Sequence, residues 1–266
     1  MKLRYLLTTA GVVLLAALAV FQQSAEPRRA RAAAESRELL IYCGITMIKP
    51  VADIARIIER QEGCRITITK GGSGNLLRSI RVNRVGDLYL PGSESYMETA
   101  RQEGLVSETV FVGYNKAALM VREGNPRGIS SDLASLADPD YYVVIGDPDS
   151  GSIGRETRRI LERRGIFPEV AANARRLTTD SKDLARMLRD GEADLVVNWY
   201  ATSTWPENAP YLDALPIDER YAARKRLVLG LLRCSRHPDI AGKFMAYAAS
   251  EEGRRLFGTY GLYDVR

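Results

Sequence analysis

The stretch Lys70-Gly71-Gly72-Ser73-Gly74-Asn75-Leu76-Leu77 joins a strand-like run to a helical pattern through a glycine-rich turn. Residues 66–69 before it alternate isoleucine with threonine, as strands do, and the two leucines after it begin an apolar helix face. The first backbone N–H groups of a helix have no partner within the helix, and partial positive charge accumulates there. The turn therefore brings the Ser73 hydroxyl and unpaired N–H groups together, an arrangement that binds small anions.

The same arrangement occurs earlier in the chain, at Thr46. An apolar strand-like run at 39–43 precedes it, and an amphipathic helical pattern over about 47–61 follows it. We expect Thr46 to cap this helix, because threonine is a favoured N-cap residue. Two strand-to-helix turns that carry hydroxyl groups indicate a shared task, the holding of a small oxyanion.

Strand-like and helical segments alternate along the rest of the chain, which is typical of an α/β fold with parallel sheets. Two such runs joined by extended crossings predict two lobes with a cleft between them. We expect residues 37–116 and 227–266 to form lobe 1, and residues 117–226 to form lobe 2. Further strands are expected at 87–90, 117–121, 142–146, 194–198 and 227–232. Ligands of open α/β sheets bind beyond the carboxyl ends of the strands, where the hydroxyl-bearing turns lie.

The first 36 residues are typical of an export segment with a linker. Lys2 and Arg4 precede an apolar run over 5–21, and small residues suited to cleavage follow near Ala25 and at 32–34. The sequence therefore predicts a periplasmic or extracytoplasmic protein. The segment is either cleaved or retained as a membrane anchor.

The positive charge of the chain does not indicate a nucleic-acid partner. The formal net charge is +5, but residues 1–34 contribute five basic residues and one acidic residue. The remainder has 33 basic against 32 acidic residues, interleaved as on an ordinary solvated surface. No zinc-finger spacing or basic stripe with aromatic residues is present in the sequence.

Residue types that carry catalysis or metal binding are scarce. His237 is the lone histidine, and Cys43, Cys64 and Cys234 have no metal-ligand spacing, so we expect buried free thiols. The sequence contains no G-x-S-x-G elbow, P-loop or HExxH motif. We therefore expect neither an enzyme nor a bound cofactor.

Over about residues 38–262 the chain resembles the periplasmic molybdate-binding component of ABC transporters, within the type 2 periplasmic binding proteins. The motifs that carry this resemblance are Tyr42-Cys43-Gly44-Ile45-Thr46-Met47, Gly72-Ser73-Gly74-Asn75-Leu76, Gly86-Asp87-Leu88-Tyr89, Gly146-Asp147-Pro148 and the terminal segment 250–262. The chain departs from the molybdate pattern at Gly44-Ile45-Thr46, at Ser152-Ile153 and at Ser203.

The resemblance implies a set of ligand-binding residues. Side-chain donors would be the hydroxyls of Thr46 and Ser73 and the phenol of Tyr200, although a shift of one residue would put Trp199 in place of Tyr200. Backbone N–H donors would come from Thr46, Ser73, Gly92, Ile153 and Ser181.

The resemblance also implies a function. The protein would be an exported, monomeric solute-binding protein that closes around molybdate, tungstate or a similar oxyanion and delivers it to an ABC permease in the membrane. The alternative ligands are ferric iron, another inorganic anion or a small organic anion. For iron, the paired tyrosines Tyr141-Tyr142 stand at a strand start, away from the expected site. A sensory or enzymatic derivative of the fold is the alternative from another class.

Overall fold

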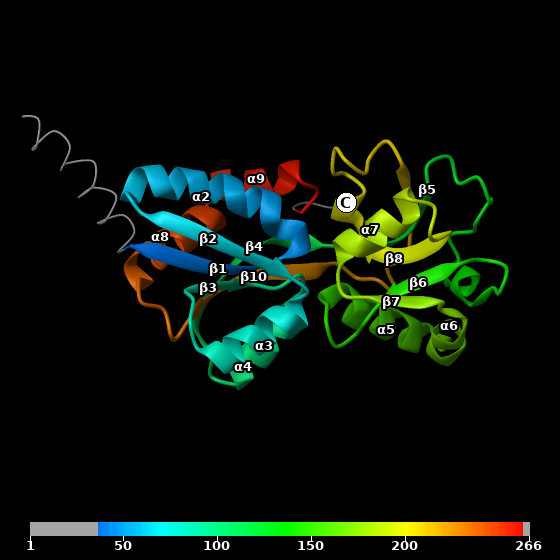
Figure 1. Ribbon diagram of the computed structural model, residues 1–266, viewed down its shortest axis with the longest axis horizontal. Helices are drawn as coiled ribbons and strands as arrows, with labels where there is room; N and C mark the ends of the chain where they lie inside the picture. Colours follow the sequence, from blue (N-terminus) through cyan, green and yellow to red (C-terminus); the bar gives the residue numbers. More distant parts are fainter. Residues whose placement is uncertain (1–36, 263–266) are drawn as a thin grey trace, which may run out of the picture.

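The computed structural model describes residues 37–262. The expected export segment at 1–36 lies outside the described residues. Within residues 37–262, no helix is both long enough and apolar enough to cross a membrane. The described chain forms two lobes, each built on a five-stranded sheet (Figure 1).

Lobe 1 is built on a mixed sheet with the strand order β2-β1-β3-β10-β4. β1 pairs in parallel with β2 and β3, whereas β10 runs antiparallel to both β3 and β4. The strands are β1 Glu38–Gly44, β2 Arg65–Gly71, β3 Leu88–Leu90, β4 Val106–Asn115 and β10 Lys225–Leu232.

Helices cover both faces of this sheet (Figure 1). The apolar residues of α2, α8 and α9 pack in one buried cluster, and those of α3 and α4 pack in another on the opposite face. The short 3-10 helix η1, Ile45–Met47, leads directly into α2. The helices are α2 Ile48–Glu62, α3 Ser73–Asn83, α4 Glu94–Gln102, α8 Pro238–Ala249 and α9 Glu251–Thr259.

Lobe 2 has a sheet of the same size with the strand order β7-β6-β8-β5-β9. β6 pairs in parallel with β7 and β8, and β5 runs antiparallel to β8 and β9. The strands are β5 Ala117–Arg122, β6 Val143–Gly146, β7 Arg176–Thr178, β8 Leu195–Trp199 and β9 Leu212–Pro216.

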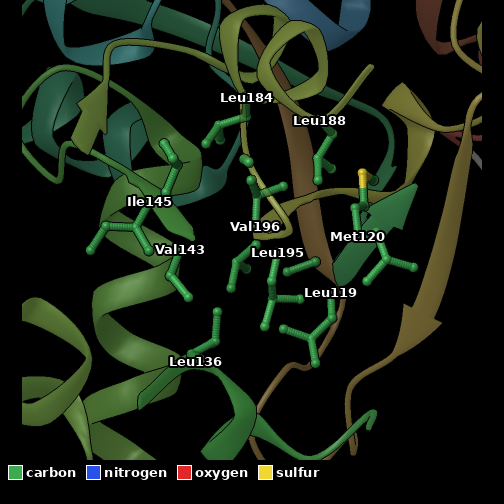
Figure 2. Packing of buried hydrophobic residues seen from close by; sticks show 14 of the residues in the cluster. Leu119, Met120, Leu136, Val143, Ile145, Leu184, Leu188, Leu195 and Val196 are labelled. Atoms are coloured by element: carbon green, nitrogen blue, oxygen red, sulfur yellow. The ribbon is translucent and has the colours of Figure 1, made fainter. Parts of the chain in front are cut away.

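A continuous apolar core holds lobe 2 together. α7 lies on one face of the sheet, and α5 and α6 lie on the other (Figure 1). Leucine, isoleucine and valine side chains from the central strands β6 and β8 meet those of α7 (Figure 2). The helices are η2 Leu133–Ala137, α5 Ser152–Arg164, α6 Phe167–Asn173, α7 Ser181–Arg189 and η3 Tyr200–Thr202.

The chain crosses between the lobes twice. The first crossing follows Asn115, the last residue of β4, and β5 begins at Ala117. The second crossing lies between the end of β9 at Pro216 and the start of β10 at Lys225. Crossings of this kind keep the two sheets side by side, with the carboxyl ends of β1, β2, β6 and β8 at the junction.

Two expectations on local structure need correction. Thr46 does not cap the following helix, because the chain enters η1 before α2 and no side-chain cap forms at either N-cap. Cys43 and Cys64 are buried free thiols, as expected, but Cys234 is partly exposed. Burial raises the pKa of the Cys43 thiol, which keeps that thiol protonated and unreactive.

Candidate functional site

A small cavity lies between the two lobes, at the carboxyl ends of the strands. The space between its lining residues, together with the part that is open to solvent, is about 230 Å³. Only about one water molecule fits between the lining residues in this closed form. A larger ligand can therefore enter only if the two lobes separate slightly. The residues that line the cavity are Ile45, Thr46, Gly71, Gly72, Ser73, Gly92, Gly151, Ser152, Ile153, Asp180, Ser181 and Trp199.

Four helical N-termini converge on this cavity. Thr46 lies within η1, while Ser73, Ser152 and Ser181 are the first residues of α3, α5 and α7. The first N–H groups of each helix lack intrahelical acceptors, and the helix dipole makes each N-terminus partly positive. Two of these N-termini come from lobe 1 and two from lobe 2, so a guest placed between them would contact both lobes.

Three hydroxyl groups at the cavity each accept a hydrogen bond from a group that only donates. The Gly92 backbone N–H donates to Ser73 Oγ over 3.0 Å, and Trp199 Nε1 donates to Ser152 Oγ over 3.2 Å. The Asn115 side-chain Nδ2 donates to Thr46 Oγ1 over 3.2 Å. Since each hydroxyl oxygen already accepts a hydrogen, its own hydrogen is available to donate.

The Thr46 hydrogen has a weak partner in this structure. Thr46 Oγ1 lies 2.8 Å from the Met47 sulfur, and a thioether is a poor acceptor. A charged oxygen at the cavity would be a better acceptor for the same hydrogen. The arrangement therefore favours a ligand that accepts hydrogen bonds.

Fixed charges contribute little to the cavity. No lysine or arginine is among its lining residues within the described chain. Asp180 is the charged residue there, and its Oδ1 accepts hydrogen bonds from the backbone N–H groups of Lys182 and Asp183 as the N-cap of α7. Neutral dipoles thus supply most of the positive potential, as in anion sites built from backbone N–H groups.

The family model for bacterial extracellular solute-binding proteins matches residues 39–263, which is most of the chain. The chain belongs to this family. A putative binding protein of Haemophilus influenzae is 24% identical over 232 residues, covering 87% of this chain and 93% of that protein.

Solved structures show that this solute-binding protein has the type 2 periplasmic binding protein fold. It is similar to the periplasmic molybdate-binding protein of Azotobacter vinelandii, with a TM-score of 0.69 and 15% identity over 84% of this chain and 98% of that one. It is equally similar to the sulfate-binding protein of Mycobacterium tuberculosis, with a TM-score of 0.72 and 13% identity over 85% and 86% of the chains. An iron-bound protein of Pseudomonas aeruginosa has the same fold, so the fold alone does not fix the ligand.

The lobes of this solute-binding protein are pressed together beside the cavity. The backbone N–H groups of Gly74 and Asn75 in lobe 1 donate to the Ser150 carbonyl in lobe 2, over 3.0 and 3.3 Å. A Cβ added at Gly72 would lie 2.7 Å from the Thr179 carbonyl oxygen and closer still to that of Ser150. The two backbones can therefore come this close only because residue 72 has no side chain.

Tyr96 makes two further contacts between the lobes on the same side of the cavity. Its hydroxyl, from α4 of lobe 1, donates to the Pro148 carbonyl of lobe 2 over 3.1 Å. The Arg155 guanidinium of lobe 2 lies 3.4 Å from the centre of the Tyr96 ring, a cation–π contact. Burial raises the pKa of Tyr96, although Arg155 acts to lower it, so the phenol stays protonated and donates.

Replacing Tyr96 with phenylalanine is expected to weaken ligand binding about threefold to tenfold, because one net hydrogen bond of the closed form is lost. The ring and its contact with Arg155 remain. The ligand dissociation rate, measured by stopped flow, should rise. Tyr260→Phe is the matched control, since its hydroxyl donates to Asp53 within lobe 1 over 2.7 Å. Equal effects of the two variants on dissociation would contradict the role of Tyr96 in closure.

Five of the six expected ligand-binding residues line the cavity: Thr46, Ser73, Gly92, Ile153 and Ser181. The sixth residue, Tyr200, is not among the residues that line this cavity. Its side chain is 38% exposed, and the adjacent Trp199 lines the cavity instead. The difference is local: Trp199 is the last residue of β8, and the chain turns into η3 at Tyr200.

The expected backbone donor at Gly92 also has a different role. Its N–H donates to Ser73 Oγ, so Gly92 acts on a ligand through that hydroxyl. Ser152 Oγ is not among the expected donors, whereas Trp199 is the stated alternative to Tyr200. A serine at the start of a helix is the signal that Ser152 shares with Ser73.

Proposed function

We propose that this solute-binding protein captures a fully deprotonated tetrahedral oxyanion, such as molybdate or tungstate, and delivers it to an ABC permease. The observation that carries the proposal is the set of three hydroxyls, Thr46, Ser73 and Ser152, whose oxygens already accept hydrogen bonds. Such a set donates to its guest. A dianion without protons is the small ligand that needs donors alone.

The size of the cavity and its lack of cationic side chains are compatible with the same ligand class. The room open to a guest is close to that of one water molecule, far below the range of about 300–1,000 Å³ usual for pockets that hold drug-sized molecules. The absence of lysine and arginine from the lining does not oppose anion binding, because helix N-termini supply aligned N–H groups.

Hydrogen bonds to a charged ligand each contribute about 1.5–3 kcal/mol. Several of them, set against the cost of removing a dianion from water, lead to an expected affinity in the micromolar to nanomolar range, about −8 to −12 kcal/mol. Both lobes contribute donors, so the affinity also depends on the population of the closed form.

The alternatives are ferric iron, another inorganic anion or a small organic anion. Iron prefers tyrosinate, histidine or carboxylate ligands. Among the lining residues, Asp180 alone is of these types, and its carboxylate already caps α7. No group of three or more His, Cys, Asp or Glu residues suited to a metal occurs within residues 37–262. The observations on the cavity therefore favour an oxyanion over iron.

Titration calorimetry with molybdate, tungstate, sulfate and phosphate tests the proposal. We expect molybdate and tungstate to bind. Phosphate should bind at least about tenfold more weakly at neutral pH, because its proton needs an acceptor: a hydroxyl that accepts from the phosphate while it already accepts from the protein no longer donates to the ligand in the same contact.

Two outcomes would contradict the proposal. Absence of both heat and thermal stabilisation with all four ions would exclude the oxyanion function. Tightest binding of phosphate would exclude the donor-only site and would indicate the Asp180 carboxylate as an acceptor. A visible charge-transfer band after addition of ferric iron would instead support the iron alternative.

A further inference from the structure

Asn115 lies at the end of β4, directly before the first crossing between the lobes. Its side chain is fully buried, at 0% exposure. A buried amide is costly unless its hydrogen bonds are made. Its nitrogen and its oxygen have very different surroundings, which indicates what the residue does.

The amide nitrogen contacts both site segments of lobe 1. Nδ2 donates to Thr46 Oγ1 over 3.2 Å and to the Gly92 carbonyl over 3.0 Å, with a longer contact of 3.9 Å to the Met47 sulfur. The Oδ1 atom is buried and has no hydrogen-bond partner among residues 37–262. The side chain therefore acts as a donor.

The orientation of this amide follows from chemistry. The Gly92 carbonyl oxygen accepts and never donates. Turning the amide around would put Oδ1 against that oxygen, acceptor facing acceptor. Nδ2 must therefore face Gly92, and the Thr46 oxygen beside it must accept as well.

One side chain thus controls two of the three hydroxyls. Asn115 donates to Thr46 Oγ1 directly, so the hydroxyl hydrogen of Thr46 points away from the amide; in this structure it lies on the weak Met47 sulfur acceptor, which a charged ligand oxygen would replace. It holds the Gly92 peptide by its carbonyl, and the N–H of Gly92 in turn donates to Ser73 Oγ. Because Asn115 belongs to the strand that leads into the crossing, both hydroxyls are tied to the junction of the lobes.

We infer that Asn115 is a positioning residue that orients the Thr46 and Ser73 hydroxyls as donors toward the oxyanion. This inference rests on the proposed function. Asn115 does not line the cavity, and it acts on the ligand through these two hydroxyls.

A double-mutant cycle between Asn115 and Thr46 tests the inference. Asn115→Leu keeps the number and branching of the side-chain heavy atoms but removes the donor, and Thr46→Val removes the hydroxyl. Each single variant should weaken molybdate binding about tenfold or more, because a donor to a charged ligand is lost or misdirected. The double variant should be no more than about threefold weaker than the weaker-binding single variant, because residues in one network are not additive.

Asn173→Ala is the matched control. Its Nδ2 also donates to two carbonyl oxygens, those of Leu136 at 2.9 Å and Asp138 at 2.8 Å, but within lobe 2 and away from the cavity. It should lower the thermal midpoint without changing affinity. Asn115→Ala is the second variant if Asn115→Leu fails to fold, and the ligand-free thermal midpoint is measured for each.

The outcomes separate the two proposals. If wild-type protein binds none of the four oxyanions, the proposed function fails, and the inference fails with it. If wild-type protein binds molybdate but the effects of the two substitutions add, or Asn115 variants retain affinity, Asn115 has a purely structural role and the inference alone is overturned.

Discussion

Replacing Gly72 with alanine is expected to weaken oxyanion binding about a hundredfold or more, since apparent affinity falls with the population of the closed form. The added methyl carbon would lie 2.7 Å from the Thr179 carbonyl oxygen and closer to that of Ser150, both in lobe 2. Backbone carbonyls do not move aside as a flexible side chain does. The lobes would have to separate, and the donors of lobe 2 would lose their distance to the ligand.

The backbone of Gly72 does not itself require glycine. Its φ of −62° and ψ of 139° are ordinary extended values, so alanine is unstrained there within lobe 1. The ligand-free thermal midpoint of the variant should therefore stay close to that of the wild type. Loss of affinity with retained stability would locate the effect in closure.

Gly242→Ala is the matched control for this substitution. Gly242 lies in α8 of lobe 1, outside the cavity lining, and a Cβ there would meet nothing within 4 Å. Calorimetry on both variants compares a glycine at the cross-lobe contact with one that has no such contact. Wild-type affinity in Gly72→Ala would show that the closed arrangement is not the ligand-binding form.

Replacing Ser73 with aspartate is expected to abolish binding, a loss of about a thousandfold or more. Two like charges about 4 Å apart repel by about 4 kcal/mol at the effective dielectric constant typical near protein surfaces. The lining residues contain no lysine or arginine to offset the new charge. The first position of α3 tolerates an acidic residue in a helix, because the N-terminus is partly positive.

Ser73→Ala separates loss of the donor from added repulsion. It should cost about 1–3 kcal/mol in ligand affinity, as expected for one donor to a charged ligand. Ser79→Ala is the control on the same helix, because the Ser79 hydroxyl donates to the Asn75 carbonyl over 3.1 Å outside the cavity lining. Affinity measured by calorimetry should be unchanged in Ser79→Ala. Retained affinity in either Ser73 variant would remove Ser73 from the site.

The alternation of strands and helices could be predicted from the sequence where the apolar period was regular. The expected strand at 39–43 is β1 Glu38–Gly44, and the helix expected over about 47–61 is α2 Ile48–Glu62. β4 Val106–Asn115 was not predicted, because its inner positions alternate weakly and it contains Glu108 and Gly113. β7 and β9 were missed as well: β7 has three residues, and β9 ends in a proline.

The candidate site was partly predictable for a related reason. Thr46 and Ser73 stand at strand-to-helix turns, and the positions of such turns follow from the local pattern. Whether Trp199 or Tyr200 faces the cavity depends on the last residue of a strand, and strand ends are the least determined part of such a prediction. Asn115 could not be found, because its partners lie at positions 46 and 92 and are brought to it by the tertiary fold alone.

The lack of lysine and arginine among the described lining residues bears on how the protein would bind its ligand at different salt concentrations. Dissolved salt screens exposed charges over a Debye length of about 10 Å at 0.1 M ionic strength, and it screens buried groups much less. The ligand affinity of a site built from enclosed dipoles would therefore change little as ionic strength rises. Such a site would also attract an approaching ion little over long distances, so the association rate would be set by diffusion without electrostatic steering. The dissociation rate would depend on how often the lobes open.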